Sequence, residues 1–254
     1  MKTLLYSICI LFLTFFQNKS VNAQAMIDLE TGPVFTGYNE IRSPVDLGTF
    51  FSLKDDLKSE TKIFYRLRAS YIMKSRHTIS LLYAPLEIKS EGSVANDIFF
   101  KGVLFDANTQ INGTYKFNSY RLTYRYNLVN KPKIVFGLGL TAKVRDAEIN
   151  LSSTGLSAGE ASIGFAPIIN FSLWWKMDDK LGLLLDGDAL VTPKGRAEDV
   201  HMAATYKFSD NMGIRAGYRI LEGGVDNSKG YGFVLFHYAS VGISYTFKNK
   251  IKAN

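Results

Sequence analysis

The chain has 254 residues, with 30 lysines and arginines against 23 aspartates and glutamates, a formal net charge of +7 and a single cysteine. One cysteine excludes a disulfide scaffold. Cys9 also lies in a segment that we expect to be removed, so thiolate metal sites and cysteine catalysis are excluded as well. A basic balance is typical of nucleic-acid binding. Here the arginines are spread singly along the chain, and the chain begins like an exported protein, so no nucleic-acid partner is expected.

The first residues have the composition of a secretory signal peptide. Lys2 supplies the positive start, residues 4–16 are apolar, and residues 21–23 form a small-residue cleavage site before Gln24. The apolar run of about 13 residues is shorter than the roughly 20 of a transmembrane helix. We expect a signal peptide at 1–23, one domain at 24–247 and a polar tail at 248–254. No later segment is apolar for long enough to span a membrane as a helix, so a membrane-embedded mature chain must span as strands.

Alternation of apolar and polar residues with a period of two dominates the rest of the chain, which predicts strands. The predicted strands are 27–38, 62–73, 77–90, 112–128, 133–148, 161–176, 180–191, 198–208, 211–222 and 233–247. In the last of these, one face carries the apolar row from Leu235 to Phe247, and the other carries Ser240, Gly242, Ser244 and Thr246. An apolar row facing lipid and a small polar row facing a lumen are typical of membrane barrels.

Cationic side chains stand on the phase opposite the aromatics in several strands. They are Arg66, Arg68, Arg121, Arg125, Lys143, Arg145, Arg215 and Arg219. A soluble sandwich also alternates, so the phase alone leaves both folds open. The regular occurrence of this pattern, together with the signal peptide and the aromatic C-terminal strand, favours the barrel.

Connections between the predicted strands alternate in length. Short turns are expected at 74–76, 129–132, 177–179 and 209–210, and longer loops at 39–61, 91–111, 149–160, 192–197 and 223–232. Short turns on the periplasmic side and long loops outside are the asymmetry of outer-membrane barrels. The sequence therefore predicts an all-β fold, a single antiparallel transmembrane β-barrel of about ten strands. Residues 50–53 and 98–105 are candidate extra strands, which leaves eight or twelve open.

Aromatic residues near the predicted periplasmic turns fit the interfacial belt of such a barrel. They are Tyr126, Trp174, Trp175, Tyr245 and Phe247. An ordinary aromatic core is the alternative.

Several stretches carry a resemblance to small Gram-negative outer-membrane barrels over nearly all of the mature chain. The terminal ISYTF resembles the strand that the barrel-assembly machinery recognises. YKFNSYRLTYRY (115–126), GRAEDV (195–200) and GYRILEGG (217–224) resemble an uncharacterised barrel family, which implies no activity. The partners implied are outer-membrane lipid, lipopolysaccharide and the assembly machinery, with a monomer in the cell outer membrane.

The lumen phase collects the eight cations together with Glu30, Asp186, Asp188 and Asp199. A narrow barrel has room inside only for side chains, and buried charges must be paired. We therefore expect an interlocked ion-pair plug. The functional alternative is a basic constriction that passes anions, which needs an open channel.

Two residue pairs, one of two aspartates and one of an aspartate and a histidine, supply the candidate catalytic residues. They are Asp186 with Asp188 and Asp199 with His201. Counting across the predicted loop 192–197 places Asp188 opposite His201, and a carboxylate beside a histidine can orient it as a general base. Asp-x-Asp and Asp-x-His on a ten-stranded barrel resemble the omptin proteases, which implies Asp199 and His201 as a water-activating dyad. Here the two pairs lie on adjacent strands, whereas omptins place them across a cleft.

Other motifs carry less chemistry. His237 lies on the lipid phase, but Ala239 stands where a lipid A deacylase would have serine, so an interfacial histidine is the simpler interpretation. No metal spacing or phosphate loop is present, and no cofactor is expected. The leading hypothesis is a non-enzymatic barrel, either structural or a narrow passive pathway for solutes. The alternatives are a surface hydrolase, protease-like or lipid-modifying, and a receptor that acts through loops 39–61 and 91–111.

Overall fold

A computed structural model of the whole chain describes residues 23–193, 195–228 and 230–248. These residues form strands, turns and loops, so the predicted all-β class is confirmed. Apart from Ala23, which begins the first strand, the predicted signal peptide lies outside the described residues, as does most of the predicted tail. None of the described residues forms a helix of the length and hydropathy that crossing a membrane requires.

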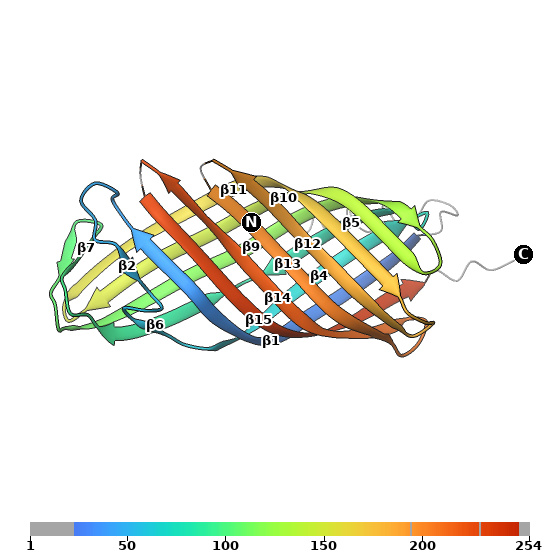
Figure 1. Cartoon of the computed structure of the whole chain (residues 1–254), viewed down its shortest axis with the longest axis horizontal. Coiled ribbons are helices and arrows are strands. Elements are labelled where there is room, and N and C mark those ends of the chain that lie inside the picture. Colours follow the sequence, from blue (N-terminus) through green and yellow to red (C-terminus); the bar gives the residue numbers. More distant parts are fainter. Residues whose placement is uncertain (1–22, 194, 229, 249–254) are drawn as a thin grey trace, which may run out of the picture.

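Ten antiparallel strands, one of them in two pieces, close into a barrel whose strands run obliquely to its long axis (Figure 1). In chain order the strands are β1 (Ala23–Arg42), β4 (Lys62–Met73), β5 (His77–Ala84) continued by β6 (Glu87–Ser93), β9 (Gln110–Asn130), β10 (Ile134–Ser153), β11 (Leu156–Lys176), β12 (Leu181–Thr192), β13 (Gly195–Lys207), β14 (Met212–Asn227) and β15 (Gly230–Lys248). The ring closes between β1 and β15, where Ala25 lies opposite Phe247. Closure satisfies the backbone groups of both terminal strands, which an open edge would leave unpaired.

The outer wall carries the apolar phase that the sequence predicts. On β15, Val241, Ile243, Tyr245 and Phe247 are exposed, whereas Ser240 on the opposite phase is buried. Similar exposed apolar residues occur on every strand of the ring. An apolar belt around a closed barrel is stable in lipid, where no water has to solvate it.

The two ends of the barrel differ. The turn end has the short connections 74–76, 131–133, 177–180 and 208–211, and Trp174 and Trp175 lie beside the third of these. The loop end has two long connections, 43–61 and 94–109. They contain the small strands β2 (Phe51–Ser52), β3 (Lys58–Ser59), β7 (Ile98–Phe100) and β8 (Val103–Phe105). In the predicted orientation the turn end is periplasmic and the loop end is extracellular.

The small strands settle the strand number. β2 pairs with β1 and β3 pairs with β6, while β7 and β8 pair with each other in a separate sheet. They fold over the loop end (Figure 1) and do not cross the barrel wall. The two candidate extra strands therefore form, but they leave the barrel at ten strands.

The predicted long loops at 149–160, 192–197 and 223–232 are wrong. Only two positions separate β10 from β11, β12 from β13 and β14 from β15. The strands continue beyond the roughly 9–11 residues that cross a membrane. Above the lipid the outward face of a hairpin is wet, so the outward apolar row that marks a strand ends there, while Ala147, Leu151 and Ala158 on the inward phase are buried. For these three connections, the two ends of the barrel differ in how far the strands extend beyond the lipid, and not in the length of the loops.

The wall is uneven at the loop end. β11 pairs with β10 along its whole length, but with β12 only from Ile169 onward. Pro167 lies just beyond this point and has no amide hydrogen to donate to a ladder. The β12–β13 hairpin thus stops short of the loop-end half of β11, whereas β14 ends only two residues beyond its last pair with β13.

Candidate functional site

The lumen near the middle of the barrel is filled by a network of buried charges, which we term the ion-pair layer. Its members are Asp28, Glu30, Arg66, Arg68, Arg121, Arg125, Asp186, Asp188, Asp199, Arg215 and Arg219. They come from β1, β4, β9, β12, β13 and β14, on strand positions that alternate with lipid-facing residues. Alternation points these side chains into the lumen, and closure of the ring brings residues that are distant in sequence together there.

Asp199 on β13 is the centre of the layer. Its carboxylate lies 2.9 Å from Arg66, 2.6 Å from Arg121 and 2.5 Å from Arg219. The Asp199 side chain is 1% exposed. Three guanidinium groups around one carboxylate compensate the cost of removing that charge from water.

The β1 side of the layer is built on a forked contact. Arg219 donates from Nε and Nη2 to the two oxygens of Glu30, both at 2.8 Å. Arg215 donates to Glu30 at 2.9 Å and to Asp28 through both of its terminal nitrogens. Bidentate pairs fix orientation as well as charge. Asp28 did not feature among the predicted partners, although its place two residues before Glu30 puts it on the same phase.

The β12 side of the layer holds the two remaining carboxylates. Asp186 accepts hydrogen bonds from Arg68 at 3.1 Å and Arg125 at 2.9 Å. Asp188 accepts from Arg121 Nη1 at 2.6 Å. Thr141 and Asn170 donate to the other oxygen of Asp188, at 2.7 and 3.0 Å. Both carboxylates are thus held by several donors.

Two of the predicted lumen cations stand apart. Lys143 is 5% exposed and forms no ion pair with the described residues, and its Nζ lies 5.3 Å from the centre of the Phe117 ring. Such a cation–π contact is favourable when it is shielded from water. Arg145 lies nearer the loop end and also lacks a carboxylate partner within the described part of the chain.

The register of the β12–β13 hairpin corrects one expectation. His201 lies opposite Asp186, and Asp188 lies opposite Asp199, so the predicted pairing of Asp188 with His201 is wrong by two residues. Thr192 pairs with Gly195, so the centre of the connection lies one residue earlier than that of the predicted loop 192–197, and the register shifts by two. His201 therefore lies two residues nearer the turn end than Asp199, which occupies the position opposite Asp188.

His201 is fully buried and its hydrogen-bond partner is a serine. Nε2 lies 2.8 Å from Ser240 Oγ on β15, and Nδ1 has no partner among the described residues. No hydrogen bond joins His201 to Asp199 in the described part of the chain, since the Asp199 carboxylate is held by arginines. Sequence reasoning missed Ser240, which alternation places on the lumen phase but whose contact with a residue two strands away it cannot give.

The chemistry open to these residues is narrow. A general base must reach the proton that it removes. His201 is 0% exposed and Ser240 is 3% exposed. The carboxylates of Asp186, Asp188 and Asp199 are also buried, so they do not face water either. The described residues also contain no group of three or more His, Cys, Asp or Glu side chains arranged to hold a metal ion.

A second filling, which we term the aromatic plug, lies between the ion-pair layer and the loop end. Its rings are Phe51, Phe64, Phe100, Phe105, Tyr115, Phe117, Phe236 and Tyr238, all of them buried. Phe64 and Tyr238 pack edge to face with ring centres 4.7 Å apart, and Phe51 and Phe100 do so at 5.6 Å. β7 and β8 supply Phe100 and Phe105, so the long connections complete the plug from above.

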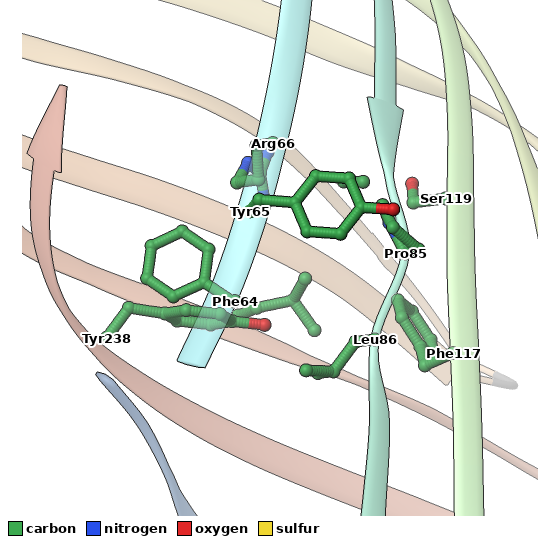
Figure 2. A pocket seen from close by; sticks show the side chains of 10 residues that line it. Phe64, Tyr65, Arg66, Pro85, Leu86, Phe117, Ser119 and Tyr238 are labelled. Atoms are coloured by element: carbon green, nitrogen blue, oxygen red, sulfur yellow. The ribbon is translucent and has the colours of Figure 1, made fainter. Parts of the chain in front are cut away.

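The two fillings meet at the break between β5 and β6. Figure 2 shows Arg66 and Ser119 beside Phe64, Leu86 and Phe117, around a cavity of about 10 Å³. Pro85 interrupts the ladder there, and the Leu86 amide donates to Asn118 Oδ1 at 3.3 Å in its place. The space between the layers is about the volume of one water molecule.

A larger space, which we term the mouth cavity, lies at the loop end of the barrel. Its volume is about 280 Å³. β1, β9, β10, β11, β14 and β15 contribute to its walls, with Asn39, Arg145 and Glu160 among the lining residues. None of these positions except Arg145 featured among the predicted site residues.

His237 lies on the outer wall, as its phase predicts. Its Nδ1 is 2.5 Å from the hydroxyl of Tyr218 on β14, and the two rings are stacked. A histidine and a tyrosine side by side on the lipid-facing wall have the amphipathic character of interfacial residues.

Comparisons with known proteins show which solved structures share this fold. No protein-family model matches the sequence, and no curated protein matches it significantly. Among solved structures, the outer-membrane protease OmpT from Escherichia coli superposes with a TM-score of 0.57 at 12% identity, over 91% of this chain and 99% of that one. The fold is that of an outer-membrane β-barrel.

Other outer-membrane barrels match at lower TM-scores. The translocator domain of the autotransporter NalP from Neisseria meningitidis gives 0.47 at 12% identity, over 97% of this chain and 95% of that one. An outer-membrane channel from Pseudomonas putida F1 gives 0.43 at 10% identity, over 91% and 98%. The matched proteins include a protease, a translocator and a channel. At such identities the likeness extends to the fold alone.

Proposed function

We propose that this outer-membrane barrel is a closed, non-enzymatic scaffold that presents its loop end to the outside. The observation that carries the proposal is the double filling of the lumen. The ion-pair layer occupies the middle of the barrel, and the aromatic plug lies between it and the loop end. A solute would have to displace both, which means breaking buried ion pairs and unpacking aromatic rings.

The passive-pathway form of the hypothesis has less support. A basic constriction passes anions when its cations face water along an open path. Here the layer's arginines donate to carboxylates, and Arg66, Arg121 and Arg219 are at most 4% exposed. Ten strands enclose little more than their own inward side chains, and in this chain those side chains are long.

Planar-bilayer recording tests the proposal. We expect no stepwise conductance from the purified, folded protein, with folding verified by heat-modifiable migration on a gel. A known porin inserted into the same bilayer is the control for the recording. Reproducible current steps that scale with salt concentration would contradict a closed scaffold and restore the solute pathway.

The surface-hydrolase alternative draws no support from the geometry, because His201 is buried against Ser240 and Asp199 is bound by three arginines. Incubation of folded protein with basic peptides tests it. We expect no cleavage by the wild type, and no difference after His201→Ala. Cleavage that the substitution abolishes would establish the hydrolase in place of the scaffold.

Lipid and lipopolysaccharide are the partners that we propose for the outer wall, and the assembly machinery for the strand ending at Phe247. The apolar belt supports the first, and the aromatic ending of β15 supports the second. Phe247→Ser should slow folding into lipid vesicles when assembly machinery is present, and should leave spontaneous folding in detergent nearly unchanged.

A further inference from the structure

The mouth cavity contains polar groups that the protein itself leaves unused. Asn39 on β1 lines the cavity and is 1% exposed, and neither its Oδ1 nor its Nδ2 has a hydrogen-bond partner among the described residues. Buried amides are normally satisfied, because an unpaired one costs the desolvation of both its atoms. An amide left in this state at a cavity wall is suited to bind a ligand that both accepts and donates hydrogen bonds.

Arg145 on β10 lines the same cavity. Its Nε is buried without a partner, and Nη2 donates only a long hydrogen bond of 3.4 Å to Ser162. Each arginine of the ion-pair layer, by contrast, contacts at least one carboxylate. Gly164 lies opposite Arg145 on β11, and a side chain there would contact the guanidinium group. The glycine leaves that face of Arg145 uncovered.

The three carboxylates that line the cavity, those of Glu40, Glu148 and Glu160, are contacted by other side chains. Glu160 lines it, but Lys101 lies 2.9 Å from one carboxylate oxygen and Ser43 donates to the other at 2.8 Å. Glu148 lies 4.0 Å from Lys116, which also pairs with Asp146 at 2.9 Å, and Glu40 accepts a hydrogen bond from the Tyr231 hydroxyl. Arg145 is the cation in the lining and has no carboxylate counterpart in the described residues, so an anionic group is favoured beside its guanidinium.

The remaining walls are largely apolar. Tyr115, Ala147, Ile149, Val225 and Phe233 all line the cavity. A volume of about 280 Å³ lies at the small end of ligand pockets. An apolar cavity with a few convergent polar groups is the usual composition of a small-molecule site.

We propose that the mouth cavity binds a small soluble anion with a compact apolar body, a carboxylate or phosphate monoester, through Arg145 and Asn39. The guanidinium group holds the anionic oxygens, Asn39 completes the hydrogen bonding, and the aromatic and aliphatic wall covers the body. This inference goes beyond the closed scaffold and does not depend on it, because a cavity at the loop end binds ligand whether or not the lumen conducts.

Titration calorimetry of the folded full chain in detergent micelles with phenyl phosphate tests the site. We expect saturable binding at one site per chain, and binding of the uncharged benzyl alcohol weaker by about tenfold or more, since hydrogen bonds to charged groups are the strong ones. Absence of saturable phenyl phosphate binding by the wild type would overturn the proposal.

Substitutions locate the site. Arg145→Gln should weaken phenyl phosphate binding by about tenfold or more. Lys89→Gln removes the same charge from β6 but neither lines the cavity nor pairs with a carboxylate that does, so it should change binding by less than about twofold through screened long-range attraction. Equal affinity of Arg145→Gln and wild type would also refute the assignment.

A second variant guards against misfolding of the first. Asn39→Asp is close in shape and places a carboxylate in the same cavity as Arg145, where it competes with the ligand for the guanidinium group. We expect binding to weaken as it does in Arg145→Gln, with heat-modifiable migration retained. Unchanged phenyl phosphate affinity in folded Asn39→Asp contradicts the site.

Discussion

The ion-pair layer and the aromatic plug fill the same lumen by different physics. Asp199 is held by three arginines that leave little freedom for any of the four side chains. Phe236, one level nearer the loop end, is equally buried but is held by rings, with Tyr115 at 6.0 Å and Tyr238 at 6.4 Å. The first depends on charge balance and the second on volume.

The difference shows what each layer tolerates. Electrostatic interactions strengthen in a medium of low dielectric, and so does the cost of leaving one charge without its partner. Dispersion contacts are many and individually weak, so an apolar layer loses stability in proportion to the volume removed. The same degree of burial therefore predicts two different responses to substitutions that conserve shape.

Asp199→Asn should produce the largest loss. The amide conserves shape but leaves three guanidinium groups facing a neutral side chain, and breaking a buried pair typically costs about 3–5 kcal/mol. Urea unfolding in micelles, followed by heat-modifiable migration, measures the free energy of unfolding. Asp210→Asn is the control, because Asp210 is exposed at the turn end and pairs there with Lys207. Equal stability of the two variants would mean that the layer is not a cooperative network.

Phe236→Leu should cost less, about 1.5 kcal/mol or below, because an apolar replacement of nearby volume repacks. Phe236→Ala in the same protein should cost about 3–5 kcal/mol, since it opens a cavity among the rings. The same unfolding assay measures both. If Phe236→Leu were as costly as Asp199→Asn, the contrast between the two layers would fail.

A smaller effect is expected at the turn end. The backbone amides of Leu181 and Lys180 donate to the Asp178 carboxylate, both at 2.7 Å, and hold its pKa below the ordinary 3.8. A depressed carboxyl pKa contributes stability above the unfolded pKa, and this contribution is lost as the pH falls through the folded value.

Asp178→Ala should therefore be slightly less stable than the wild type at neutral pH, with the difference shrinking below about pH 4. Unfolding at a series of pH values measures it, with Asp179→Ala as the neighbouring control. A stability difference that stays constant down to the acid limit would show that the amide hydrogen bonds do not act through the ionised form.

The sequence predicted the barrel because alternation with a period of two survives wherever one face meets lipid. The ten long strands, their phase and the place of Phe247 in the lipid-facing row all follow from that pattern. It failed at the loop end, where 149–160 and 223–232 continue as strands whose outward face no longer meets lipid. The outward apolar row ends there, and Leu151 and Ala158 are buried on the inward phase.

The interior was predictable in kind but not in pairing. The phase of Arg66 and Arg219 placed them in the lumen, but which carboxylate each contacts depends on the stagger of strands around the ring. Asp28 and Ser240 were missed for that reason. The aromatic plug was not predicted although Phe64, Phe117 and Phe236 stand on the lumen phase, because alternation gives the phase of a ring but not the rings against which it packs.

Thiol accessibility tests the filled lumen most directly. The described residues contain no cysteine, so single substitutions report one site each. Ser119→Cys places a thiol where the two layers meet, at a position 1% exposed, and Ser162→Cys places a matched thiol in the wall of the mouth cavity. With a charged methanethiosulfonate reagent, we predict rapid labelling of Ser162→Cys and labelling of Ser119→Cys only at the rate of local opening. Equally rapid labelling of both would show a water-filled lumen and contradict the account.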